Sequence, residues 1–196
     1  MIEPVVDFYD VNAATYFDKT AFVDPQAFLR PFAERLVPGS RVVDVGCGSG
    51  RDLLWLKSRG YQVKGIERSC KLAELARKHA GCEVVAGDFE SWNFSGNPVD
   101  GLLLVGALVH IPHEDVGRIL GHIISGLVPG GKVLLTLKEG KGISRGTDGR
   151  VFHLWQDSDL RRVLKEVGLE ALYFDRLVSA IRKGDIWLTY VLEKGE

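Results

Sequence analysis

Short apolar runs alternate with helix-like segments from residue 41 to residue 167. Each run has the length of a buried strand, and each intervening segment carries apolar residues at three- and four-residue spacing, as amphipathic helices do. The expected strands are 41–46, 61–67, 82–87, 99–107 and 132–138, and the expected helices are 50–59, 69–79, 112–124 and 157–167. Such alternation predicts a parallel sheet with helices on both faces.

Capping and turn residues set the expected ends of these elements. Ser69 is expected to cap the helix that Gly81 ends, and Asp157 to cap the helix that runs to residue 167. The "PGG" at 129–131 is expected to stop the helix that starts at Pro112. The glycines and charges of residues 139–150 indicate a loop long enough to be functional.

The two ends of the chain depart from this alternation. Residues 169–177 and 185–194 are both strand-like with no helical pattern between them, so the connection is a hairpin and the last strand runs antiparallel to the rest. Residues 5–36 read as two amphipathic helices, with Tyr9 and Tyr16 available to cover the upper edge of the sheet. We expect one domain over 1–196, in which residues 1–38 form a helical cap and 39–196 form the core.

Composition narrows the class of protein. The 196 residues are 45% hydrophobic, and 25 basic residues balance 26 acidic ones, so a nucleic-acid partner is not expected. The amino-terminal segment lacks the pattern of a signal peptide, and the longest apolar run is too short to cross a bilayer. Three cysteines without metal-like spacing fit a reducing compartment. These features predict a cytoplasmic protein with no membrane contact.

Three glycines directly follow the first strand, in "VVDVGCGSG". Glycine is costly to order, so such a cluster indicates that a ligand comes close to the backbone. The dinucleotide fingerprint requires a third glycine three residues after Gly48, where this chain has Arg51. A nicotinamide-dependent oxidoreductase is therefore the weaker interpretation.

Two acids end neighbouring strands. Glu67 closes the second strand, where a carboxylate can accept hydrogen bonds from both hydroxyls of a ribose, and Asp88 follows the third, where it can accept from an adenine amino group. The alternatives are an ordinary strand-end carboxylate for Glu67 and a turn-forming role for Asp88. Ligands of open parallel sheets bind at this carboxyl edge. The two acids and the glycine loop predict a site for an adenosine with a small tail.

With these motifs in view, the chain resembles the class I S-adenosylmethionine-dependent methyltransferases. The matching stretches are "VVDVGCGSG", "VKGIE", "AGDFE", "LLLVGALVHIP" and "LVPGGKVLLTLK", in that family's order. The finer details resemble small bacterial methyltransferases of the tellurite-resistance-like kind. The resemblance implies an α/β, Rossmann-like, seven-stranded, mostly parallel sheet with an antiparallel last strand. It also implies S-adenosylmethionine as cofactor, S-adenosylhomocysteine as product, and no metal.

The resemblance also assigns residues. The implied cofactor site consists of Asp44, Gly46, Cys47, Gly48, Arg51, Glu67, Arg68, Asp88, Phe89, Val105 and Gly106. Within it, Cys47 is expected only to be small. Arg51 either contacts the cofactor or stabilises the first turn of a helix, and Arg68 either stacks on the adenine edge or points into water.

Residues of the acceptor side follow from their place near the transferred methyl group. His110 follows the fourth strand and is the candidate general base, the alternative being a ring that hydrogen-bonds the loop backbone. Candidate substrate contacts are Tyr9, Tyr16, Lys138, Arg150 and Trp187, the alternatives being core packing for the three aromatic residues and a solvated loop for the two cations. Those from the region after the fifth strand could recognise an anionic or thiol substrate.

The leading hypothesis is therefore in-line methyl transfer to a small-molecule acceptor by a monomer or homodimer. The alternatives are an NAD-dependent oxidoreductase and a non-catalytic module that binds S-adenosylmethionine to regulate a partner. No catalytic base is needed if the acceptor is already an anion.

Overall fold

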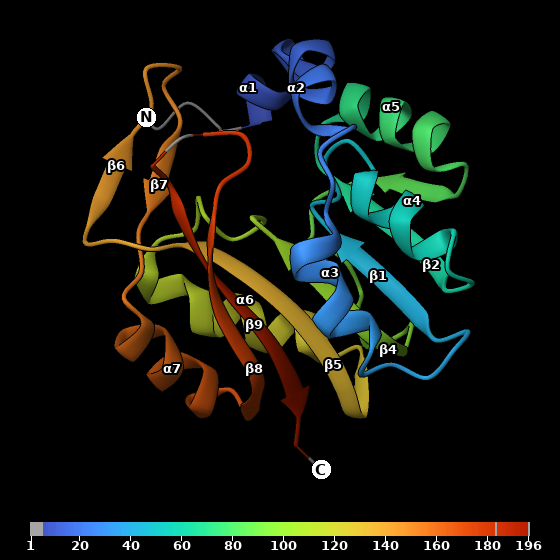
Figure 1. Ribbon diagram of the computed structural model, residues 1–196, viewed down its shortest axis with the longest axis vertical. Coiled ribbons are helices and arrows are strands. Elements are labelled where there is room, and N and C mark those ends of the chain that lie inside the picture. Colours follow the sequence, from blue (N-terminus) through green and yellow to red (C-terminus); the bar gives the residue numbers. More distant parts are fainter. Residues whose placement is uncertain (1–5, 183, 196) are drawn as a thin grey trace.

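The computed structural model of the protein describes residues 6–182 and 184–195. A central sheet of seven strands has the order β3-β2-β1-β4-β5-β9-β8. The strands are β1 (Arg41–Val45), β2 (Gln62–Glu67), β3 (Glu83–Ala86), β4 (Val99–Val105), β5 (Leu127–Lys138), β8 (Leu169–Val178) and β9 (Ile186–Lys194). Figure 1 shows the first three at one side of the sheet and the last three at the other. The predicted seven-stranded sheet is confirmed.

Only the last strand runs against the rest. β9 lies between β5 and β8 and pairs antiparallel with both, for example through Leu135 opposite Tyr190. The pairs β1–β2, β1–β4, β2–β3 and β4–β5 are parallel. The chain order reverses between β1 and β4, and this is where a ligand crevice is expected in an open sheet.

Helices cover both faces of the sheet. They are α4 (Arg51–Lys57), α5 (Cys70–Ala80), α6 (His113–Ile124) and α7 (Asp157–Glu166). Alternation along β4 sends Leu102 and Leu104 into the core under α6 and α7, whereas Leu103 packs in the core beneath the N-terminal helix of residues 26–33. No helix in the described part of the chain is long and apolar enough to cross a membrane.

The amino-terminal region corrects the prediction of two helices. It forms three, α1 (Val6–Val11), α2 (Ala13–Thr20) and α3 (Gln26–Ala33), and the predicted residues 1–5 lie outside the described part. The second break follows Thr20, where Pro25 precedes α3 and Asp24 Oδ1 accepts from the Gln26 N–H. In Figure 1 α1 and α2 lie at the edge of the sheet beside α5, while α3 packs on its face.

Three boundaries also differ from the predicted ones. The expected loop 139–150 contains a strand, because β6 (Ile143–Arg145) pairs with β7 (Val151–His153) in a separate hairpin. Asp157 is the first residue of α7 instead of its cap, which is Gln156. α6 ends before "PGG", which lies within β5 where the register with β4 shifts. The Ser69 cap and the Gly81 end of α5 are confirmed.

Candidate active site

The glycine loop turns sharply over the end of β2. The N–H groups of Gly46 and Cys47 both donate to the Ile66 carbonyl, at 2.8 and 3.1 Å. Gly48 has φ +55°, and a Cβ there would lie 3.4 Å from the Tyr16 ring. Only glycine adopts this backbone region without strain. Glycine is therefore favoured at position 48, and its backbone faces the Tyr16 ring with no side chain between them.

Glu67 joins this loop to the second strand. Its two carboxylate oxygens accept from the backbone N–H groups of Gly48 and Ser69, each at 2.9 Å. Burial raises the pKa of Glu67, and those backbone donors oppose the shift. Two bonds from separate segments fix the plane of the carboxylate.

Asp44 presents a different situation at the end of β1. It is 2% exposed, and its Oδ2 has no hydrogen-bond partner among the described residues. Burial, and then the nearby Asp52 carboxylate, raise its pKa well above the ordinary value. A buried acceptor without a donor is costly, so this oxygen is suited to a cationic or N–H-bearing ligand.

Two adjoining cavities lie along this edge of the sheet. The smaller, about 200 Å³, extends over Glu67 toward Phe89, and the larger, about 340 Å³, extends over Asp44 toward the ends of β5 and β9. Both are lined by Tyr9, Tyr16, Gly46, Gly48, Val105 and Gly106. The shared lining makes them two arms of one hollow, which meet at the glycine loop and the end of β4.

The predicted site residues gather around this hollow. Glu67, Arg68, Phe89 and His110 line the smaller arm. The larger arm is lined by Asp44, Cys47, Arg51, Lys138, Arg150 and Trp187. Asp88 lines neither arm, although Gly87 and Phe89 on its two sides line the smaller one.

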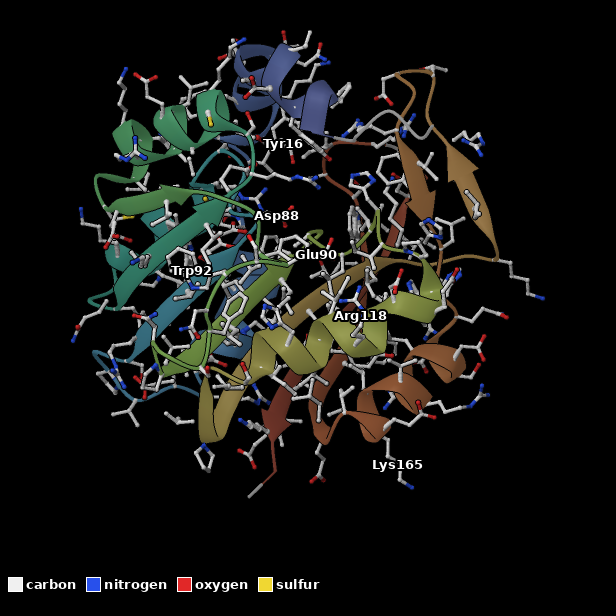
Figure 2. All side chains as sticks on the ribbon, turned by 180° about the vertical axis from the view of Figure 1, so that it is seen from behind. Tyr16, Asp88, Glu90, Trp92, Arg118 and Lys165 are labelled. Atoms are coloured by element: carbon white, nitrogen blue, oxygen red, sulfur yellow. The ribbon has the colours of Figure 1, made fainter. Side chains whose placement is uncertain are left out.

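Asp88 is held in place by its own neighbours. Its Oδ1 accepts from the Glu90 N–H at 2.9 Å, and its Oδ2 lies 3.3 Å from Arg68 Nε. Figure 2 shows Asp88 in the segment after β3, with Tyr16 on the side of the amino-terminal helices. The Arg68 guanidinium therefore pairs with the acid that was predicted to hold adenine.

Two other predicted residues of the larger arm, Arg51 and Cys47, contact neighbouring side chains of the protein. Arg51 Nε donates to Asp52 Oδ1 at 2.7 Å, and its guanidinium lies 5.2 Å from the Phe28 ring centroid. Cys47 is buried in a cluster with residues of α4, α5 and β3, and burial raises its pKa, which keeps the thiol protonated. Its small side chain packs in that cluster.

Several residues that line the larger arm were not predicted from the sequence. Thr136 and Thr189 line the larger arm from paired positions on β5 and β9, and Asp185 lines it from the connection between β8 and β9. The sequence pattern could have indicated the two threonines, since they are polar residues within otherwise apolar strands. No sequence pattern indicates Asp185, because its position depends on how the β8–β9 hairpin folds back.

His110 is neutral and its ring is fully engaged. Its Nδ1 contacts the Val151 carbonyl, which can only accept, so Nδ1 carries the proton and Nε2 accepts from the Tyr9 hydroxyl at 2.9 Å. Burial lowers the pKa of His110 to about 4. Both features match the alternative of a histidine that hydrogen-bonds the loop backbone, and they leave its basic nitrogen occupied.

The lowered pKa of His110 predicts acid sensitivity. The unfolded chain binds a proton at this histidine below about pH 6.5, whereas the folded protein does so only near pH 4. Stability should therefore be fully present above pH 6.5 and fall as the pH drops toward 4. Urea unfolding at several pH values checks this: His110→Gln should show a shallower loss of unfolding free energy over that range. Parallel curves for the two proteins would contradict it.

The chain is similar to several known methyltransferases. A family model described as "Methyltransferase domain" matches residues 42–131. Probable tRNA methyltransferase 9B of Bos taurus is 29% identical over 67% of this chain, and thiopurine S-methyltransferase of Pseudomonas putida is 34% identical over 49% of it. The aligned regions cover 28% and 47% of those proteins, so the chain spans less than half the length of these curated relatives.

A solved structure extends the likeness to nearly the whole chain. The Burkholderia thailandensis 1,6-didemethyltoxoflavin-N1-methyltransferase, determined with 1,6-didemethyltoxoflavin and S-adenosylhomocysteine bound, superposes with a TM-score of 0.77. The match covers 97% of this chain and 85% of that chain at 22% identity. At this identity the likeness establishes the fold.

Proposed function

We propose that the protein transfers a methyl group from S-adenosylmethionine to a small-molecule acceptor, because a methyltransferase-domain model matches residues 42–131 and the sheet has the fold of a solved S-adenosylhomocysteine-bound methyltransferase. The proposal rests on one observation above all. A buried carboxylate oxygen of Asp44, which has no hydrogen-bond partner in the part of the chain that the structure describes, lies beside a main-chain turn built on glycine, and Glu67 holds that turn.

The residues present fit the cofactor. Asp44 would accept from the ammonium of its methionine end, and Gly46 and Gly48 leave the backbone open to it. Glu67 would accept from the ribose hydroxyls. Phe89 would lie against the adenine, with Asp88 and Arg68 at its edge. Val105 and Gly106, where the two arms of the hollow meet, would lie nearest the methyl group.

The chemistry requires little of the protein beyond alignment. When bound, S-adenosylmethionine supplies an activated methyl group: the acceptor's lone pair forms the new bond to carbon as the sulfur–carbon bond breaks and leaves its electron pair on sulfur. Tyr9 and Tyr16 line both arms where these meet, and with the cofactor and acceptor bound they would exclude water from the junction. His110, neutral and hydrogen-bonded to Tyr9, orients that ring.

The larger arm supports a small acceptor. At about 340 Å³ it is of the size that ligand pockets have, and its lining combines aromatic rings with a few charged groups. Action in the cytoplasm is part of the proposal and is supported by three cysteines that are all free. We also propose one domain with residues 1–38 as its cap, acting as a monomer or homodimer.

Calorimetry with S-adenosylhomocysteine and NAD tests the function. We expect micromolar binding of the first and none of the second, followed by formation of S-adenosylhomocysteine when S-adenosylmethionine is incubated with a library of small acceptors. Binding of NAD alone would establish the oxidoreductase. Tight binding without turnover on any acceptor would favour the regulatory module, and turnover on total tRNA alone would exclude a small acceptor.

A further inference from the structure

A buried cation lies at the far end of the larger arm. Lys138, the last residue of β5, has a side chain that is 9% exposed, and its ammonium pairs with Asp185 at 2.5 Å. The same nitrogen lies 4.1 Å from the Phe152 ring centroid and 5.6 Å from that of Trp187. A desolvated ammonium needs an anion beside it, and here the anion comes from the β8–β9 connection.

The sheet arranges polar and aromatic groups in a line that leads to this cation. Thr136 lies opposite Thr189, and Lys138 opposite Trp187, in the β5–β9 register, so all four side chains belong to one face. The Thr189 hydroxyl is buried and has no partner among the described residues. Trp187 reaches back to Gly106, where a Cβ would lie 3.4 Å from its ring. The line therefore runs from the proposed methyl position to the ammonium.

A second cation faces the same arm from the hairpin. Arg150 forms two hydrogen bonds with Asp148 Oδ2, at 2.7 and 3.1 Å, and its Nη1 donates to Tyr9. Its guanidinium also lies 4.3 Å from the Phe8 ring centroid. Each of the two cations thus lines the cavity while a carboxylate from a nearby turn neutralises it.

Of the described residues, His110 and the two tyrosines at the junction cannot act as a base for a neutral acceptor. The His110 nitrogen accepts from Tyr9, and burial raises the pKa of both Tyr9 and Tyr16, so neither phenol is ionised. An acceptor that reacts here must bring its own lone pair or arrive as an anion.

Resting on the methyl-transfer function proposed above, we propose that the acceptor is an anion with an apolar or aromatic body, and that its anionic group displaces Asp185 from Lys138. The body lies between Phe152 and Trp187, and the Thr189 hydroxyl donates a second hydrogen bond to the anion. An anion that replaces Asp185 keeps the buried ammonium paired. A neutral ligand would have to leave it unpaired or leave Asp185 in place, which excludes that ligand from the subsite.

Binding to the protein saturated with S-adenosylhomocysteine tests this assignment. The probes are naphthalene-2-carboxylate and naphthalene-2-carboxamide, which share a body and differ in charge. We expect the carboxylate to bind at least about tenfold more tightly, as a charge-assisted hydrogen bond provides. Lys138→Met should remove this preference, whereas Lys132→Met, which breaks the ion pair with Glu193 elsewhere on β5, should keep it.

Asp185→Asn separates the proposal from a merely structural ion pair. If Asp185 competes with the ligand, this variant binds the carboxylate several times more tightly than the natural protein does. Weaker binding in both Asp185→Asn and Lys138→Met, equal affinity for the two probes, or no binding of either probe would overturn the proposal. Failure of the methyl-transfer function is seen separately, as absent binding of S-adenosylhomocysteine, and the probe preference can still be measured without it.

Discussion

Replacing Glu67 with alanine is expected to lower the affinity for S-adenosylhomocysteine by about a hundredfold. The carboxylate would lose its bonds to the ribose, and each bond to a charged group is worth about 1.5–3 kcal/mol. The change also frees the Gly48 and Ser69 N–H groups that Glu67 now accepts from, so the glycine loop loses one of its hydrogen bonds to β2. Calorimetric titration of the variant against the natural protein measures both losses together.

Two further variants make this test specific. Glu67→Gln keeps one oxygen acceptor and the shape of the side chain, so it should fall between the natural protein and Glu67→Ala. Glu83→Ala removes an exposed acid at the start of β3 that pairs with Lys64 on the surface, so the affinity should not change. Affinity of Glu67→Ala within threefold of the natural protein would remove Glu67 from the site.

Much of the site could be predicted because its residues are fixed by their own strands. Glu67 and Asp44 occupy strand ends that the apolar pattern alone defines, and the carboxyl ends of parallel strands meet at one edge. The glycines follow the first of these strands without a gap. The local sequence pattern is therefore sufficient to predict that these residues lie together at one edge of the sheet.

What the sequence could not predict depends on contacts between distant segments. The tautomer of His110 is set by Val151 on the hairpin and by Tyr9 on α1, 41 and 101 residues away. The partner of Lys138 lies 47 residues later in the chain. The 139–150 segment was predicted as a loop because its short strand is exposed along its length and has no apolar alternation. In each case a contact between segments far apart in the sequence sets the structure, and the local sequence pattern does not indicate it.

Gly50→Ala should destabilise the fold by about 2–4 kcal/mol. Gly50 has φ +75°, which costs an alanine about 1 kcal/mol or more. An added Cβ would lie 2.9 Å from the Ala76 carbonyl oxygen and 3.1 Å from the Ala76 Cα, so α4 and α5 would have to separate. Overpacking of this kind costs about 1–3 kcal/mol more. A lower midpoint of urea unfolding, with an unchanged dependence of the unfolding free energy on urea concentration, measures this loss of stability.

Gly60→Ala is the matched control for the contribution of close packing. Gly60 has a similar φ of +84°, but a Cβ there would meet no atom within 4 Å. Gly60→Ala should lower the free energy of unfolding by about 1 kcal/mol or less, because the alanine also restricts the unfolded chain. The difference between the two variants then measures how tightly α5 is pressed against the turn that carries the proposed site. Equal losses would mean that backbone strain alone requires glycine at position 50, and that α5 can yield without cost.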